Sequence, residues 1–184
     1  MNARKISLGI LATAAVLGSV TVLAVTQFNP SALQKPGRLK TAVMQRVKFW
    51  AIQRRASAPT VQLERTPENL RSGRSHFEEH CAVCHGLDGR GQSLVGRGLN
   101  PPVPDLASPS VQAWRDADLF WIIQNGIRFT GMPGFEDTHS DTETLQLVLY
   151  MREFARMSDQ DRQALLEQAA ESNQGHTHAP GEEH

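Results

Sequence analysis

The stretch Cys81-Ala82-Val83-Cys84-His85 decides how the rest of this 184-residue chain is interpreted. Two thiols three positions apart can each form a thioether with a haem vinyl group, and the adjacent imidazole can then bind the iron. Zinc sites and redox dithiols also use Cys-x-x-Cys. For zinc, the nearby His76 and His80 run directly into Cys81 and leave no chain to fold around a metal. For a redox dithiol, the flanking sequence lacks alternating strands and helices. We therefore predict one covalent haem c, attached at Cys81 and Cys84 and ligated by His85.

Composition and charge predict one globular domain with appendages. The chain is 40% hydrophobic and 21% charged, with no net charge. The charge is unevenly distributed: residues 26–65 hold eight Lys or Arg and one acid, whereas residues 66–184 hold nine Arg, no Lys and eighteen acids. Both cysteines lie in the motif, so a disulfide framework is not expected.

The N-terminal segment is apolar and long. Residues 6–25 carry no charge and follow Arg4 and Lys5, and such a run can span a bilayer as one helix. A cleaved signal peptide is the alternative, with Val22 and Ala24 as small residues before the cleavage point. The length favours a retained anchor over residues 1–25, and either interpretation exports the rest of the chain.

Residues 26–65 are predicted to be a basic amphipathic linker. Leu39, Val43, Val47 and Trp50 recur at helical spacing among basic residues. Such a helix either lies on anionic headgroups or a membrane partner, or serves as a solvated spacer. Both interpretations remain open from the sequence.

A folded domain is predicted over residues 66–156. Thr66 and Pro67 suit the start of a helix that runs to about His80, with Gly73 and Phe77 on one face. A capping box at Ser140 and Glu143 begins a second apolar helix, which ends near Arg156. We expect these two helices to pack against each other.

These residues together resemble a class I cytochrome c of the membrane-anchored bacterial type. The resemblance rests on Gly73 and Phe77 before the motif, on Met132 in Gly131-Met132-Pro133-Gly134, and on Leu147 and Tyr150 in the last helix. It implies an all-α fold in which the first and last helices cross, with Gly73 and Phe77 against Leu147 and Tyr150. It also implies that Met132 is the second axial ligand of the haem iron, opposite His85.

The residues around Met132 support a ligand role. Gly131, Pro133 and Gly134 keep Met132 out of a helix and let the backbone approach a flat cofactor. A core-filling methionine is one alternative, and His139 is a second candidate ligand. The resemblance further implies that a carbonyl of Pro101, Pro102 or Pro104 accepts the ring N–H of His85.

Residues 157–184 are predicted to form a short helix and a polar tail. Ser158 and Asp161 open the helix, which runs through Ala170. The tail contains His176, His178 and His184, which either bind a metal ion or belong to a disordered, solvated segment.

With both axial positions occupied, the predicted function is electron transfer rather than catalysis. The expected donors are dehydrogenases or quinol-oxidising complexes, and the expected acceptors are oxidases or reductases; no nucleic acid is expected as a partner. The resemblance to bacterial cytochromes implies an inner-membrane anchor with the haem domain facing the periplasm. Two alternatives remain: a fixed cytochrome c subunit of a larger membrane oxidoreductase, and a haem-based sensor in which Met132 is displaced.

Overall fold

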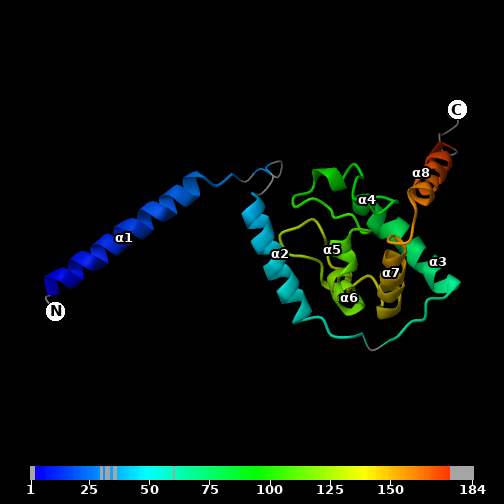
Figure 1. Ribbon diagram of the computed structural model, residues 1–184, viewed down its shortest axis with the longest axis horizontal. Coiled ribbons are helices and arrows are strands. Elements are labelled where there is room, and N and C mark those ends of the chain that lie inside the picture. Colours follow the sequence, from blue (N-terminus) through cyan, green and yellow to red (C-terminus); the bar gives the residue numbers. More distant parts are fainter. Residues whose placement is uncertain (1–2, 30, 32–33, 35–36, 60, 175–184) are drawn as a thin grey trace, which may run out of the picture. The chain divides into compact units, whose positions relative to one another are not determined.

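The computed structural model describes residues 3–29, 31, 34, 37–59 and 61–174, and divides the chain into two compact units, Met1–Gln34 and Lys35–His184. Within the described residues all regular structure is helical, which confirms the predicted all-α class (Figure 1).

The first unit contains one helix, α1 (Ala3–Thr26). The stretch Gly9–Thr26 is long and apolar enough to cross a membrane, with a mean hydropathy of 2.0 and none of it buried within the protein. The hydroxyl groups of Thr13, Ser19 and Thr21 donate hydrogen bonds to carbonyl oxygens four residues earlier, at 2.8–2.9 Å. These three hydroxyl groups are therefore satisfied inside the helix.

The second unit is built from short helices around the Cys-x-x-Cys-His motif. They are α2 (Arg38–Gln53), α3 (Pro67–His76), α4 (Ala82–His85), α5 (Pro109–Gln112), α6 (Asp116–Asn125), α7 (Asp141–Glu153) and α8 (Asp159–Gln174). A π-helical turn, Phe77–Cys81, joins α3 to α4, and a 3₁₀ turn covers Gly96–Gly98.

The predicted pair of helices is α3 and α7. The Thr66 hydroxyl caps α3 by accepting a hydrogen bond from the Asn69 amide, and the Ser140–Glu143 capping box begins α7, both as predicted. The two helices pack so closely at Gly73 that a Cβ there would overlap the carbonyl group of Gln146. The predicted packing of Gly73 on α7 is therefore confirmed.

The end of the first helix differs from the prediction. Its α-helical part stops at His76 rather than near His80, and the chain continues through the π turn into α4. In this turn the Ala82 amide bonds the Phe77 carbonyl, five residues back. A π turn inserts an extra residue and rotates the chain beyond it, and such turns are frequent at functional sites. Helical periodicity alone does not reveal it.

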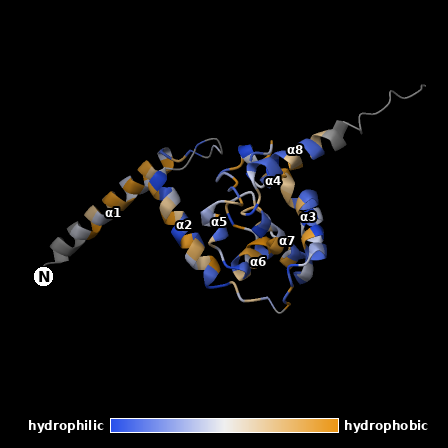
Figure 2. Ribbon diagram, turned by 45° about the vertical axis from the view of Figure 1, so that its right-hand side comes forward, coloured by the Kyte–Doolittle hydropathy of each residue, from blue (hydrophilic) through white to orange (hydrophobic). Residues whose placement is uncertain are grey.

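The core lies between the π turn, α5, α6 and α7, and Figure 2 shows much of α6 in the hydrophobic colour. The rings of Phe77, Tyr150 and Phe154 meet at centroid distances of 5.0–5.5 Å. The buried cluster comprises Phe77, Leu106, Val111, Leu119, Ile123, Leu147, Val148, Tyr150 and Phe154. Leu147 and Tyr150 thus lie in one cluster with Phe77, as the resemblance implied.

The basic helix α2 belongs to this same unit and packs on α6. The ring of Phe49 lies 4.6 Å from that of Trp114, and Ile52 is buried. The Arg115 guanidinium donates a hydrogen bond of 3.3 Å to the Gln53 carbonyl, which ties the end of α2 to the start of α6. The sequence placed residues 26–65 outside the domain as a linker; in the structure the C-terminal half of α2 contributes to the packed unit. The boundaries at residues 25, 65 and 156 stay predictions.

Helix α8 begins as predicted, because the Ser158 hydroxyl accepts a hydrogen bond from the Asp161 amide and the Asp161 carboxylate accepts hydrogen bonds from the amide and hydroxyl of Ser158. It extends to Gln174, four residues beyond the predicted end at Ala170. The predicted histidine-rich tail (His176, His178 and His184) lies outside the described residues.

Candidate haem site

The two cysteines of the motif lie at the end of the π turn and in α4. Both are free and half-buried, and their spacing places them one helical turn apart. Burial, followed by the proximity of Cys84, raises the pKa of the Cys81 thiol to about 12. Redox dithiols need a lowered thiol pKa. The environment of Cys81 therefore disfavours the redox-dithiol alternative and suits a thiol that is consumed in a covalent bond.

His85 ends α4, and its ring lies 6.4 Å from the ring of Phe77. Burial lowers the pKa of His85 to about 4, so its imidazole is neutral at pH 7. A neutral imidazole has the free lone pair that metal ligation requires.

The hydrogen bond expected for the second ring nitrogen of His85 is not formed. Nδ1 is buried and has no partner among the described residues, so the predicted contact with the carbonyl of Pro101, Pro102 or Pro104 is wrong for this structure. The hydrogen bond between the following loop and His85 involves the main chain of His85. The Gly91 amide donates to the carbonyl of His85 itself, at 2.6 Å.

The loop after the motif is closed tightly onto α4. The Ser93 hydroxyl lies 2.7 Å from the Val83 carbonyl and 3.0 Å from the Cys84 carbonyl. Gly96 packs on this same turn, where a Cβ would overlap the carbonyl oxygen of Cys84. These contacts satisfy the carbonyl groups at the end of α4 and hold the two cysteines and His85 in one rigid turn.

Met132 lies half-buried on a loop, in the non-helical conformation that was expected of it. The loop folds back on itself: the Met132 carbonyl accepts from the Ile127 amide at 3.1 Å, and the Met132 amide donates to the Thr130 hydroxyl at 3.1 Å. The backbone of Met132 is thereby fixed while its side chain stays outside any helix. This arrangement leaves the thioether free to serve as a ligand.

The other candidate ligand, His139, is held elsewhere. Its buried ring contacts His76 at 5.5 Å, His80 at 4.9 Å and Phe135 at 5.2 Å between centroids. The structure thus groups His139 with two histidines that precede the motif. Nothing in their sequence positions links the three residues.

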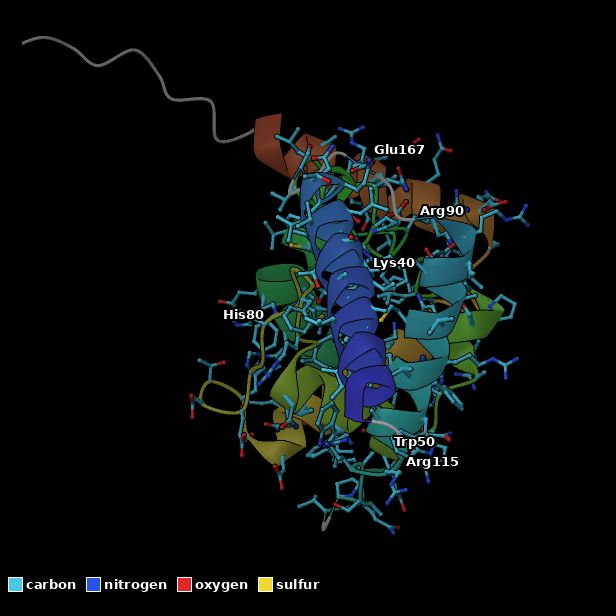
Figure 3. All side chains as sticks on the ribbon, turned by 90° about the vertical axis from the view of Figure 1, so that its left-hand side faces the viewer. Lys40, Trp50, His80, Arg90, Arg115 and Glu167 are labelled. Atoms are coloured by element: carbon cyan, nitrogen blue, oxygen red, sulfur yellow. The ribbon has the colours of Figure 1, made fainter. Side chains whose placement is uncertain are left out.

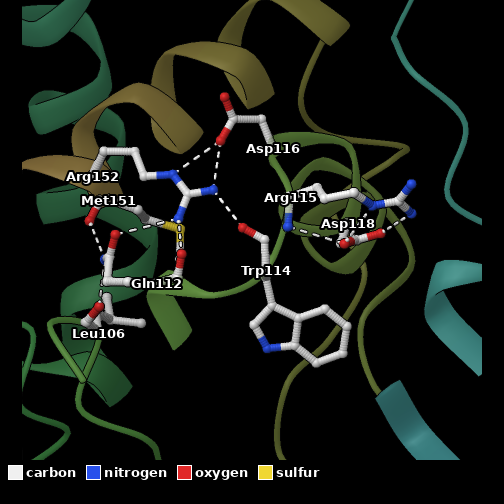
Figure 4. A network of polar contacts seen from close by, with 8 residues as sticks. All are labelled: Leu106, Gln112, Trp114, Arg115, Asp116, Asp118, Met151 and Arg152. Carbon is white, nitrogen blue, oxygen red and sulfur yellow. Dashed lines mark hydrogen bonds and ion pairs between the residues drawn. The ribbon is translucent and has the colours of Figure 1, made fainter. Parts of the chain in front are cut away.

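A polar network around Arg152 was not predicted from the sequence (Figure 4). The Arg152 guanidinium donates to the carbonyl groups of Gln112 at 3.0 Å and Trp114 at 2.6 Å, and to the carboxylate of Asp116 at 2.9 Å. It joins α7 to the segment between α5 and α6. One Arg at the end of an apolar helix was the only sequence signal, and it did not identify partners almost 40 residues away.

Asp118 is a second residue that the sequence did not single out. Its side chain is fully buried, and burial alone would raise its pKa; hydrogen bonds from the side chain and backbone of Arg115 outweigh this and lower the pKa below its usual value. Asp118 is therefore ionised and fixes the start of α6.

Comparisons with known proteins bear on this site. Residues 68–151 match the family model described as "Cytochrome C oxidase, cbb3-type, subunit III". The quinohemoprotein alcohol dehydrogenase ADH IIB of Pseudomonas putida is 31% identical over 85 residues, which cover 46% of this chain. The chain spans about a tenth of that relative, since the match covers 11% of it.

Two solved structures also match. Cytochrome CL of the marine methylotrophic bacterium Methylophaga aminisulfidivorans is 18% identical, and the match has a TM-score of 0.39. This match covers 65% of the present chain and 72% of the cytochrome CL chain. The Kuenenia stuttgartiensis reducing HAO-like protein complex is 24% identical, covers 56% of this chain and 53% of its own, and has a TM-score of 0.46.

The residues present fit the cofactor that this family carries. Two free thiols and a neutral imidazole share one rigid turn, and that turn leads out of the helix that packs on α7 through Gly73. Their chemistry matches thioether attachment and axial ligation by one short segment. Residues 68–151 therefore form a class I cytochrome c domain, and membership of this family implies covalent binding of haem c and haem-based electron transfer.

Proposed function

We propose that this protein is an electron carrier with a single haem c, bonded to Cys81 and Cys84 and ligated by His85 and Met132. The observation that supports this most directly is the neutral, half-buried His85 in the rigid turn of the two cysteines. Met132 on its fixed loop is the available thioether.

Each of these residues has a distinct task in the proposal. The bound haem supplies one-electron oxidation and reduction of its iron. His85 and Met132 would hold the iron and exclude other ligands, so electron transfer would occur without substrate binding at the metal. Methionine ligation favours a higher reduction potential than ligation by two histidines.

We also propose that α1 anchors the protein in the inner membrane, with the haem domain on the periplasmic side. The apolar stretch Gly9–Thr26 and its internally bonded hydroxyl groups support an anchor. Cytochrome c domains are typically extracytoplasmic. Residues 66–184, with eighteen acids against nine Arg, would favour a redox partner with a basic or apolar docking surface.

The family match supports a second candidate function, a fixed subunit of a larger oxidoreductase. The matched model is named for an oxidase subunit, and the Pseudomonas putida relative is named as a quinohemoprotein dehydrogenase. Purification of the full chain in mild detergent separates the two. Co-elution with other haem or flavin subunits supports the fixed subunit, and a protein that elutes alone supports the mobile carrier.

The ligand proposal is tested by the absorption spectra of the wild type, Met132→Ala and Met44→Ala. Met44 is 53% exposed on α2 and serves as the matched control. We expect Met132→Ala to lose the sulfur-to-iron charge-transfer band and to bind carbon monoxide in the ferrous state, whereas Met44→Ala matches the wild type. An unchanged spectrum for Met132→Ala would place the second ligand elsewhere. Tight carbon monoxide binding by the wild type would instead favour the sensor alternative.

A further inference from the structure

Three histidines meet at the junction of α3, the π turn and the loop before α7. His76 is the last residue of α3, His80 lies four residues later in the π turn, and His139 directly precedes the N-cap of α7. One ligand nitrogen from each residue lies within 4.8 Å of the others. More than 50 residues separate His80 from His139, so the fold assembles this group.

Two of the three rings have one nitrogen beside an oxygen atom, at hydrogen-bond distance only for His139, and the other nitrogen unpartnered. The His139 Nδ1 lies 3.0 Å from the Thr138 hydroxyl, and the His76 Nε2 lies 3.6 Å from a Glu143 carboxylate oxygen. The opposite nitrogens, His139 Nε2 and His76 Nδ1, are buried and have no hydrogen-bond partner within the described part of the chain. A buried polar atom without a partner is costly and needs an explanation.

This pattern is the one that metal-binding histidines show. Such a residue typically donates one ring N–H to a carboxylate or another oxygen, which orients the ring and presents the second nitrogen to the metal. Glu143 is itself held in place, because its other carboxylate oxygen accepts hydrogen bonds from the amide and hydroxyl of Ser140 at 2.8 and 2.7 Å. The capping box of α7 therefore also holds the carboxylate that faces the His76 ring.

We propose that His76, His80 and His139 bind a divalent transition-metal ion of the zinc type, at a site separate from the haem ligands. Three imidazoles suit Zn²⁺, Cu²⁺ or Ni²⁺, whereas Ca²⁺ and Mg²⁺ require oxygen ligands. Ligand bonds of about 2.0–2.1 Å in a tetrahedron place nitrogens about 3.4 Å apart. The nitrogens must therefore approach one another by up to about 1.4 Å from their separation of up to 4.8 Å.

His80 can supply that movement and leaves a coordination position open. Its side chain is 40% exposed and lies at the edge of the second unit (Figure 3), so rotation about its side-chain bonds is not prevented by packing. Glu79, whose carboxylate lies 3.8 Å from the His80 ring, adds negative charge beside the site. Solvent completes the fourth position. Bound metal would link the end of α3 and the π turn, which ends at Cys81, to the start of α7.

The test uses the full-length holoprotein in detergent, freed of metal with EDTA and titrated with Zn²⁺ by calorimetry. Three proteins are compared: the wild type, His80→Gln, and a tail variant in which His176, His178 and His184 are all replaced by Gln. His80 is exposed, so its replacement should leave the haem spectrum and the Tm measured in EDTA unchanged.

We expect the wild type and the tail variant to bind Zn²⁺ equally and His80→Gln to bind it at least 10-fold more weakly. Zn²⁺ at 100 times its Kd should raise the Tm of the wild type and the tail variant, and His80→Gln should lose most of that rise. Absence of Zn²⁺ binding by the wild type overturns the proposal. The proposal is also overturned if His80→Gln binds Zn²⁺ as tightly as the wild type, whether or not the tail variant loses Zn²⁺ binding.

Discussion

Substitution of Gly73 by Ala tests whether the contact between α3 and α7 sets the packing of the haem domain. Gly73 lies within α3, where α7 approaches most closely. A Cβ at this position would lie 2.6 Å from the carbonyl carbon of Gln146 and 3.1 Å from the Cβ of Tyr150. Carbon atoms in contact prefer separations of about 3.5–4.0 Å. The helices would therefore have to move apart by roughly 1 Å.

Two opposing effects determine the size of the change. A gap of that size forfeits about a quarter to a half of the dispersion energy of the facing atoms, and Phe77 and Leu147, each 1% exposed, lie in the affected cluster. Overpacking of this kind costs about 3 kcal/mol. The replacement of Gly by Ala in a helix gains about 1 kcal/mol. The expected net loss in the free energy of unfolding is about 2 kcal/mol, or a Tm lower by about 10 °C.

The assay is denaturant unfolding of the ferric holoprotein, followed by circular dichroism in the helical region. Gly98→Ala is the matched control, because Gly98 is exposed and nothing lies within 4 Å of a Cβ built there. We expect the control to change the free energy of unfolding by less than about 0.5 kcal/mol. If Gly73→Ala is as stable as the wild type or more stable, the helix contact does not limit packing and the reasoning is refuted.

Three further predictions concern polar contacts in the second unit. The pKa of Asp118 is lowered in the folded state, so the ionised carboxylate stabilises the fold above its unfolded pKa near 4, and this stabilisation is lost as the pH falls through the folded pKa. The Asp118→Asn variant should therefore be less stable than the wild type at pH 7. In thermal melts it should also lose less additional stability than the wild type when the pH is lowered to 3. Thr144→Val removes the hydroxyl that accepts from the Gln124 amide at 2.8 Å, and we expect a loss of about 1–3 kcal/mol in chemical denaturation, since that buried donor is left unpaired. Arg152→Met should cost about 2–4 kcal/mol through the loss of its bonds to three backbone and side-chain partners; equal stability of this variant and the wild type would show that the network of Figure 4 is dispensable.

Local patterns in the sequence were sufficient for much of the fold and for the attachment motif. The helix starts at Thr66 and Ser140 were predicted from capping residues, because a cap involves only atoms three residues apart. The motif at Cys81–His85 was recognisable because thioether attachment requires a fixed local spacing. Met132 was placed on a loop because the glycines and proline around it disfavour a helix.

Features that depend on residues distant in the sequence were decided only by the tertiary structure. The contact of Phe49 in α2 with Trp114, which lies just before α6, joins residues 65 positions apart, and no local pattern at either residue predicts the other. Arg152 and its partners illustrate the same point. Such contacts depend on how helices are stacked, which local periodicity does not encode.

The haem motif and the histidine group show this division most clearly. By itself, the sequence was sufficient to predict one haem attachment site at Cys81, Cys84 and His85, since these residues lie within five consecutive positions. The sequence did not predict that His139 lies beside His76 and His80, because that proximity requires α3 and α7 to pack closely at Gly73. The tertiary structure decided it, since only the packed core determines which loop lies beside the end of a helix.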